Sequence, residues 1–186
     1  DSVPLGGQHV TNDIARGLNT SVLHAERMKT LYGSTIGNDA DEREMIDVPP
    51  VGESDRAGTN HIPRSELTRI IAPRIEELFE LVLGRLKAAG TQQISGRRVV
   101  LTGGGSQLDG AGEVAARILD KQVRLGKPMQ INGLAEATGG AAFSTCAGML
   151  RYAASGIAEN DVGALTAVER GGSTLANMGR WLRQNL

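Results

Sequence analysis

A run of glycines at the carboxyl end of an apolar segment is the feature of this sequence that points most directly to ligand binding. Gly103, Gly104 and Gly105 follow the segment 99–102 and precede a helix-like stretch, 110–119. Glycine permits positive φ angles and lets the backbone approach another group closely, because it has no Cβ. Open α/β sheets bind ligands at the carboxyl ends of their strands. The spacing is equally compatible with a ligand-binding loop and with an ordinary tight turn.

Two further groups of residues are suited to binding. Glu26 and Lys29 are three residues apart in a helical segment, so they share one helix face. From the residues alone a surface ion pair, worth about 0.2–0.5 kcal/mol, is the favoured reading of this pair. Gly6 and Gly7 form a turn before another helical segment. Backbone N–H groups in such turns can bind anionic oxygens.

Residues that carry metal or catalytic chemistry are sparse. His9, His24 and His61 lack the spacing of metal ligands, and ordinary surface or loop positions account for them. The sequence has no Gly-x-x-x-x-Gly-Lys-Ser/Thr loop, and no set of Ser, His and Asp indicates a nucleophilic triad. We therefore expect no metal site and no catalytic residue in this chain.

The hydrophobic periodicity predicts helices and strands that would position these groups. Val10, Ile14 and Leu18 form a helical stripe, and a second helix is expected over 22–31, ended by Gly33. Strands that alternate with helices indicate an α/β architecture. Further strands are predicted at 45–48, 97–102 and 123–125, and further helices at 65–89, 110–119 and 143–153.

The longest helical pattern, 65–89, contains a proline. Pro73 lacks a backbone N–H, so we expect a break or kink there and a main helix that begins near Arg74. Gly90 is expected to end this helix. The acid-rich segment 38–56 precedes it and is expected to form a solvated rim.

The composition limits the class of protein. Hydrophobic residues make up 40% of the 186 residues and aromatic residues only 3%, so the core must be largely aliphatic. The net charge of −1 argues against a general nucleic-acid binder. The single cysteine, Cys146, cannot form an internal disulfide, which fits a reducing compartment. The sequence contains no apolar run long enough to span a membrane and no signal peptide.

The two ends of the chain differ from the part between them. The chain starts without methionine and residues 2–5 read as the end of a strand, so we expect a further segment upstream. Residues 156–174 read as a flexible linker. Residues 175–186 read as an amphipathic helix that lies in a membrane interface, or alternatively as a terminal helix docked on the domain itself. The apolar face and the arginines that flank it are Leu175, Met178, Trp181, Leu182, Leu186, Arg180 and Arg183.

Four segments, in order, carry a family resemblance. They are residues 9–15, which follow the glycine pair, residues 25–29 (AERMK), residues 101–110 (LTGGGSQLDG) and the tail 181–183 (WLR). Together they resemble the carboxyl-terminal half of the FtsA family of bacterial cell-division proteins, members of the actin-like ATPase superfamily. The resemblance covers essentially the whole chain and implies the second lobe of a two-lobed fold. The implied parts are an RNase H-like core (1–19 and 91–155), an inserted α+β subdomain (20–90), the linker 156–174 and the membrane-targeting helix 175–186.

The resemblance also implies that ATP binds in the cleft between the two lobes, so that this chain holds half of the site. Glu26 and Lys29 would contact the ribose and adenine, and Gly6 and Gly7 would lie near the phosphates. The ligands of Mg²⁺ are expected mainly upstream of Asp1. The chain alone would then be inactive, and the whole protein at most a weak ATPase. The implied adenosine loop consists of Gly103, Gly104 and Gly105, with Ser106 and Gln107 beside it.

For function, the resemblance implies a scaffold that polymerises on the cytoplasmic face of the bacterial plasma membrane, at the division septum. It would tether the ring of the tubulin-like protein FtsZ by binding the FtsZ carboxyl-terminal tail, and would contact inner-membrane lipid, copies of itself and other division proteins. Ile46, Arg64, Leu67 and Arg69 are expected to form part of the docking surface. The alternatives are a soluble actin-like ATPase of the kinase or chaperone type and a pilus-assembly relative. The segment 9–15 and the amphipathic tail favour the division scaffold.

Overall fold

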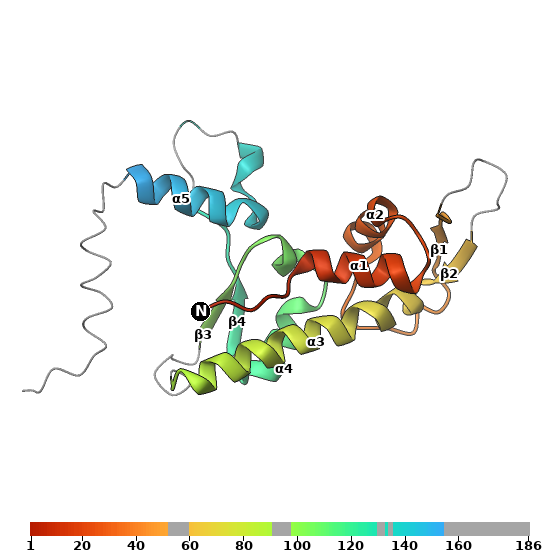
Figure 1. The fold of residues 1–186 in the computed structure, drawn as a ribbon, viewed down its shortest axis with the longest axis horizontal. Coiled ribbons are helices and arrows are strands. Elements are labelled where there is room, and N and C mark those ends of the chain that lie inside the picture. Colours follow the sequence, from red (N-terminus) through yellow and green to blue (C-terminus); the bar gives the residue numbers. More distant parts are fainter. Residues whose placement is uncertain (52–59, 91–97, 130–132, 134–135, 155–186) are drawn as a thin grey trace, which may run out of the picture. The chain divides into compact units, whose positions relative to one another are not determined.

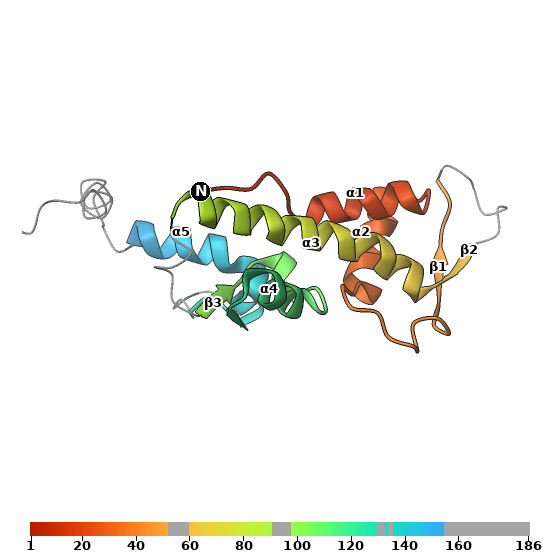
Figure 2. The same cartoon turned by 90° about the horizontal axis from the view of Figure 1, so that it is seen from below.

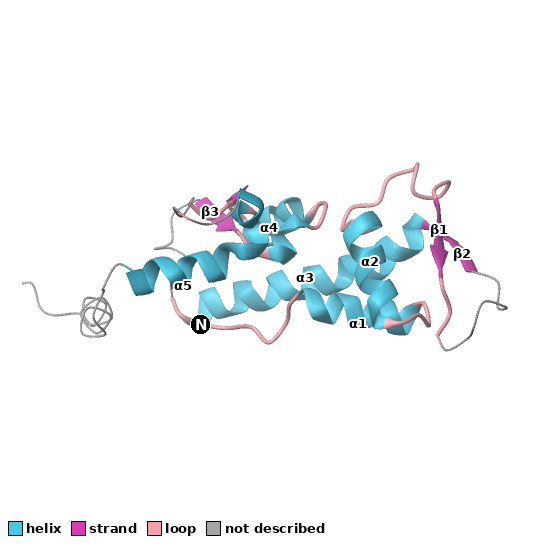
Figure 3. Cartoon of the chain, turned by 90° about the horizontal axis from the view of Figure 1, so that it is seen from above, coloured by secondary structure: helices cyan, strands magenta, loops and turns pink. Residues whose placement is uncertain are grey.

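Helices make up most of the described chain, with two small sheets between them (Figure 3). The computed structural model describes residues 1–51, 60–90, 98–129, 133 and 136–154. The chain divides into a first unit, residues 1–145, and a second unit, residues 146–186. The expected linker and amphipathic tail, 156–186, lie outside the described residues.

The order of the elements gives a mixed α/β chain, as the alternation in the sequence predicts. Within the described residues the helices predicted from periodicity are present, and their bounds differ from the expected ones mainly by a residue or so at each end. The elements are α1 (Gly7–Gly17), α2 (Val22–Tyr32), β1 (Met45–Val48), β2 (Asn60–Pro63), α3 (Arg64–Ala88), β3 (Arg98–Leu101), the 3₁₀ turn η1 (Gly104–Gln107), α4 (Ala111–Leu119), β4 (Gln122–Leu125), η2 (Glu136–Gly139), η3 (Ala141–Phe143) and α5 (Ser144–Ala154).

α3 is the element around which the first unit is assembled (Figures 1 and 2). α1 and α4 both pack against this helix, and α2 contacts it as well. Apolar residues that recur at helical spacing on each of these helices meet in a single core, which is aliphatic apart from one phenylalanine. The buried members of this core are Val10, Ile14, Ala25, Met28, Ile46, Val48, Leu67, Ile71, Ile75, Phe79, Val114, Ala115 and Leu119.

α3 runs without interruption through Pro73, so the expected start of the main helix near Arg74 is wrong. A proline inside a helix removes the hydrogen bond to the carbonyl four residues earlier, that of Arg69. Both Pro73 and Arg69 are exposed, so water can hydrate that carbonyl. Leu67 and Ile75, buried on either side of the proline, hold both halves of the helix in the same core.

The ends of α2 follow from single residues. The hydroxyl of Ser21 accepts a hydrogen bond from the backbone N–H of His24 and so caps the first turn. At the other end Gly33 is the C-cap, as predicted, with an ordinary φ of −67°. A Cβ at Gly33 would lie only 2.3 Å from the carbonyl oxygen of Lys29, so glycine is needed here for space.

Two sheets of two strands each complete the first unit. β1 and β2 are antiparallel, with Ile46 opposite Ile62, and β3 and β4 are parallel, with Val99 opposite Val123. Parallel strands need a crossover connection, and η1 and α4 provide it here. The sequence did not predict β2. Residues 2–5, read as the end of a strand, form no strand, because none of the described strands pairs with them.

The acid-rich segment is only partly a solvated rim. Asp41 is 1% exposed, contrary to the expectation for this segment. Its Oδ2 atom accepts a hydrogen bond from the backbone N–H of Asn38, and its carbonyl accepts one from the N–H of Ser65. The carboxylate also forms an ion pair with Arg64 over 3.5 Å. Asp41 is therefore a structural residue that closes the loop before β1 onto the start of α3.

Candidate functional site

A cavity of about 860 Å³ in the first unit brings together segments that are far apart in the sequence. It lies between the amino end of α1, α2, α3 and the segment 101–111, and its volume is typical of a small-molecule site. Every residue expected to bind the nucleotide, except Gly103, lines this cavity. The lining residues among those expected are Gly6, Gly7, Glu26, Lys29, Gly104, Gly105, Ser106 and Gln107.

Part of the cavity wall is apolar. Ile75, Leu78 and Phe79 of α3 contribute side chains to it, and Leu108 does so from the segment after η1. Ile75 and Phe79 also belong to the buried core, so this part of the wall is held in place by packing. A wall of this kind suits a flat apolar ring, while the other lining residues offer polar groups.

The first turn of α1 presents backbone N–H groups at the cavity. Gly6 is the N-cap, and its N–H donates to Nδ1 of His9 over 3.2 Å. A Cβ at Gly6 would meet none of the described atoms within 4 Å, so space is left beside Gly6 in that direction. The N-terminus of a helix carries a partial positive charge and free N–H groups, which together suit an anion.

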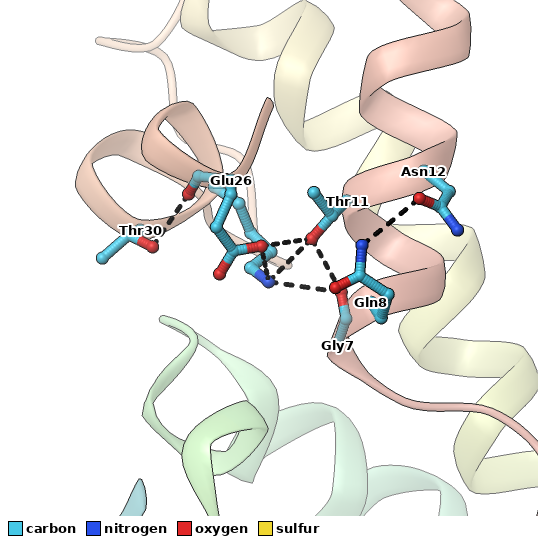
Figure 4. Close-up of polar contacts among 7 residues, drawn as sticks. Gly7, Gln8, Thr11, Asn12, Glu26 and Thr30 are labelled. Atoms are coloured by element: carbon cyan, nitrogen blue, oxygen red, sulfur yellow. Dashed lines mark hydrogen bonds and ion pairs between the residues drawn. The ribbon is translucent and has the colours of Figure 1, made fainter. Parts of the chain in front are cut away.

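Glu26 and Lys29 form part of a hydrogen-bond network that joins α2 to the first turn of α1 (Figure 4). The Nζ atom of Lys29 lies 2.7 Å from Oε2 of Glu26, 2.9 Å from the hydroxyl of Thr11 and 3.2 Å from the carbonyl oxygen of Gly7. The hydroxyl of Thr11 also contacts Oε2 of Glu26. The residues alone favoured an ion pair on the surface. In the structure the side chain of Lys29 is only 16% exposed, so the pair is partly buried.

This network sets the protonation of Glu26. Burial opposes ionisation of the carboxyl group, but hydrogen bonds from Lys29 and Thr11 and the charge of Lys29 outweigh it. The pKa of Glu26 is therefore lower than the ordinary value for glutamate. The side chain is a carboxylate at neutral pH and can accept hydrogen bonds from hydroxyl groups.

The glycine-rich loop is ordered by its own hydrogen bonds. Gly103 has φ +93°, a left-handed angle that favours glycine, and η1 follows directly. The hydroxyl of Ser106 donates to the carbonyl of Gly103 over 2.7 Å, and the side chain is buried. A Cβ at Gly105 would meet nothing within 4 Å, so the chain leaves the backbone open there. Gly103 and Ser106 shape the loop, and Gly104 and Gly105 expose its backbone.

A second set of contacts joins this loop to the end of α2. The backbone N–H and the hydroxyl of Thr35 both donate to the carbonyl of Asp109, over 2.9 Å and 3.0 Å. Gly110, with φ +76°, lies so close that a Cβ there would be 2.4 Å from the hydroxyl oxygen of Thr35 and 2.8 Å from Cγ1 of Ile36. We call residues 33–36 and 108–110 the clasp. It fixes the glycine-rich loop relative to the helix that carries Glu26 and Lys29.

Arg64 is a cavity residue that the sequence assigned to a different role. It lines the cavity, and its Nε atom donates to the carbonyl of Tyr32 at the end of α2 over 2.9 Å. Its guanidinium group also donates to Glu44 over 3.1 Å and pairs with the buried Asp41. Thr11 was not singled out from the sequence either, because its partners come from α2 and only the fold brings them together.

The residues proposed as a docking surface separate into two groups. Ile46 and Leu67 are 2% and 0% exposed and lie in the core of this chain, so neither side chain is available at the surface. Arg69 is exposed and pairs with Glu66 and Glu42. Arg69 and Arg64 are thus the members whose side chains reach the surface or the cavity. The membrane residues of 175–186 lie outside the described residues.

The described residues offer neither a metal-binding cluster nor a membrane-spanning helix. Among them no group of three or more His, Cys, Asp or Glu side chains could hold a metal ion. No helix in the part of the chain that the structure describes is long and apolar enough to cross a membrane.

The family model and the relatives that match this chain all carry the same family name. The model of the family described as "Cell division protein FtsA" matches residues 1–148. The cell division protein FtsA of Rhizobium meliloti (strain 1021) is 46% identical over an alignment of 187 positions that covers 100% of this chain and 42% of that protein. The corresponding protein of Neisseria meningitidis serogroup B is 35% identical over 98% of this chain and 44% of its own length. That of Escherichia coli (strain K12) is 31% identical over 98% of this chain and 43% of its own length. The chain therefore spans less than half the length of these relatives.

Proposed function

The chain belongs to the FtsA family of cell-division proteins, and on this premise we propose that it contributes half of an ATP site to a division scaffold. The observation that carries the ATP site is the meeting of three separate segments, around Gly6, Glu26 and Gly104, at one cavity. The family resemblance implies that each of these segments lies at the nucleotide. The name of the matched family supports a role in cell division.

The residues present fit a nucleotide. The apolar wall formed by Ile75, Leu78 and Phe79 suits an adenine ring, and the ionised Glu26 suits ribose hydroxyls. Gly7 offers the backbone N–H of a helix N-terminus to the phosphates, and Gly6 lies beside it with its own N–H donated to His9. Bound ATP would supply a charged triphosphate whose presence or loss can switch the state of the protein. We assign the Mg²⁺ ligands and any weak hydrolytic chemistry mainly to parts of the protein outside this chain.

In this proposal the chain is the second lobe of an actin-like fold. Residues 1–19 and 91–155 form its RNase H-like core, and 20–90 form an inserted subdomain. The mixed α/β character of the described residues supports this assignment. The segment 156–174 links the lobe to an amphipathic helix, 175–186.

The proposed partners follow from the family. The scaffold polymerises with copies of itself on inner-membrane lipid at the division septum, and it holds the FtsZ ring there by binding the FtsZ carboxyl-terminal tail. Arg69 and Arg64 are the candidates for contact with that tail, since Ile46 and Leu67 are buried. The kinase, chaperone and pilus-assembly alternatives are not favoured, because the reported relatives are cell-division proteins.

Gly105→Val tests the ATP site directly. A Cβ at this position meets none of the described atoms within 4 Å, and Gly105 lines the cavity, so a valine there should block a ligand with little disturbance of the fold. We expect ATP binding by the full-length protein, measured by calorimetry, to weaken at least about tenfold, which corresponds to roughly 1.4 kcal/mol. Gly139→Val is the matched control, since a Cβ there also meets nothing within 4 Å and Gly139 does not line the cavity. Equal affinities of the two variants would contradict the proposed site.

A further inference from the structure

Thr11 lies at the centre of the network that joins α1 to α2, although the family resemblance gives it no role. Its side chain is completely buried, with an exposed fraction of 0%. Its hydroxyl accepts a hydrogen bond from Nζ of Lys29 and lies within reach of two acceptors, Oε2 of Glu26 and the carbonyl of Gly7 at 3.0 Å. A hydroxyl carries one proton, so Thr11 donates to one of these acceptors at a time.

Lys29 has no proton left for a ligand within this arrangement. An ammonium group has three N–H donors. The chain supplies three acceptors, the carboxylate of Glu26, the hydroxyl of Thr11 and the carbonyl of Gly7, at 2.7, 2.9 and 3.2 Å. Lys29 therefore acts on a ligand through its neighbours, and above all through the position of Glu26.

The two oxygens of Glu26 have different surroundings. Oε2 takes the contacts with both Lys29 and Thr11. The other oxygen, Oε1, takes part in neither contact, and Figure 4 shows it directed away from both partners. The side chain is 48% exposed and lines the cavity, so Oε1 is the atom that remains for a ligand. With Oε2 held from two sides, the carboxylate has little freedom to rotate.

We propose that Thr11 is a positioning residue for the ATP site, which holds the Glu26 carboxylate in the orientation that accepts hydrogen bonds from the ribose hydroxyls. The inference rests on the proposed function. An acceptor that is oriented before the ligand arrives loses less conformational entropy on binding. Because Thr11 also contacts the carbonyl of Gly7, it ties the ribose contact on α2 to the phosphate end of the site on α1.

The test compares Thr11→Val with Thr11→Ser in the full-length protein, using ATP and 2′,3′-dideoxy-ATP. Valine keeps the shape of threonine and removes the hydroxyl, whereas serine keeps the hydroxyl. We expect Thr11→Val to weaken ATP binding about tenfold, as for loss of a hydrogen bond to a charged group. The affinity for the dideoxy nucleotide should change less than about twofold, because that ligand has no ribose hydroxyls for Glu26 to accept. Thr11→Ser should retain wild-type affinity for both ligands.

A merely structural role predicts a different result. If Thr11 only stabilised the fold, the valine variant would bind both nucleotides equally less well, and that outcome would overturn the inference. Equal ATP affinity of wild type and variant would overturn it too. Thr11→Ala leaves room for a water molecule beside Lys29, so it replaces the valine variant in the same comparison if that variant is unfolded by circular dichroism. Failure of the wild type to bind ATP at all would instead reject the proposed function itself.

The pH dependence of binding gives a second readout. Hydrogen bonds from Lys29 and Thr11 lower the pKa of Glu26, so the wild-type carboxylate persists to a lower pH than an ordinary glutamate. Loss of the Thr11 hydroxyl raises that pKa. We expect the loss of ATP affinity on acidification to begin at a higher pH in Thr11→Val than in wild type. Superimposable pH profiles would count against the positioning role.

Discussion

At the scale of single residues, the chain satisfies the charge of Lys29 almost entirely with its own atoms. A buried ammonium group is costly unless it is paired and hydrogen-bonded. Here a carboxylate, a hydroxyl and a carbonyl serve it, from α2 and from the first turn of α1. The same contacts lower the pKa of Glu26. The position of the Glu26 side chain and its protonation state therefore depend on the same contacts with Lys29 and Thr11.

The lowered pKa of Glu26 predicts how folding stability depends on pH. A carboxyl group whose pKa is lower in the folded state adds stability above its unfolded pKa, and that stability is lost as the pH falls through the folded value. We expect wild type to be more stable than Glu26→Gln near neutral pH, by at most about 1 kcal/mol because solvent screens a half-exposed pair. The difference should disappear as the pH falls below the ordinary pKa of glutamate and through the lower folded value.

Urea unfolding at several pH values measures this difference. Glu80→Gln is the control, because Glu80 is exposed on α3 and the described contacts include no ion pair for it. The difference in the free energy of unfolding between wild type and Glu80→Gln should change little with pH. A gap between wild type and Glu26→Gln that stays constant from neutral to acidic pH would contradict the assignment.

At the scale of elements, the clasp fixes the position of the glycine-rich loop relative to α2. Two donors from Thr35 meet one carbonyl of Asp109, and Gly110 packs against the side chains of Thr35 and Ile36. The loop and the helix both line the cavity, so the geometry of the site depends on this junction. The clasp lies between the two parts of the proposed lobe, 20–90 and 91–155.

Gly110→Ala should break the clasp. The new methyl group would lie 2.4 Å from the hydroxyl oxygen of Thr35, at a position with φ +76°. We expect a loss of about 1–3 kcal/mol in the free energy of unfolding, from steric overlap and backbone strain. Chemical denaturation measures it, and ATP affinity should fall as well, because the loop is displaced.

Gly112→Ala is the matched control for this prediction. A Cβ at Gly112 would lie 3.8 Å from Cδ2 of Leu125, which is ordinary contact, and the residue is inside α4. Alanine in a helix interior should raise stability by about 0.5–1 kcal/mol. If the two variants were equally stable, the clasp would not hold the loop in the way described.

At the scale of the whole molecule, a first unit with a cavity is joined to a carboxyl-terminal segment of different composition. The tail residues Leu175, Met178, Trp181, Leu182 and Leu186 share one face of an expected helix, flanked by Arg180 and Arg183. A single short amphipathic helix binds a membrane weakly. Polymerisation of the proposed scaffold would present many tails at once and so raise the overall affinity by multivalency.

Trp181 is the only tryptophan of the chain and so reports on the tail. We expect a blue shift of its fluorescence when vesicles that contain anionic lipid are added, and a smaller shift at high salt, since the arginines are screened. Leu182→Glu, which puts a charge on the apolar face, should reduce the shift. An unchanged spectrum at every lipid concentration would favour a tail that docks on protein.

Much of the fold follows from local pattern. The stripes that include Val10 and Ile14, and Leu67 and Ile75, predict α1 and most of α3, because helical periodicity is written in consecutive residues. The residues expected around the nucleotide follow from the family resemblance that short motifs carry, since the residues alone favoured a surface ion pair for Glu26 and Lys29. β2 was missed because its four residues, Asn-His-Ile-Pro, contain a single β-branched residue and end in proline, whereas the equally short strand β3 is Arg-Val-Val-Leu.

The sequence by itself determined most of the helices and strands, and which short motifs offer polar and glycine-rich groups. Only the tertiary structure decided which of these meet. Thr11 acquires its role from Lys29 and Glu26, Asp41 becomes buried because Arg64 pairs with it, and α3 tolerates Pro73 because both of its halves pack in one core. Such contacts depend on distances between segments remote in the chain, and no local periodicity encodes those distances.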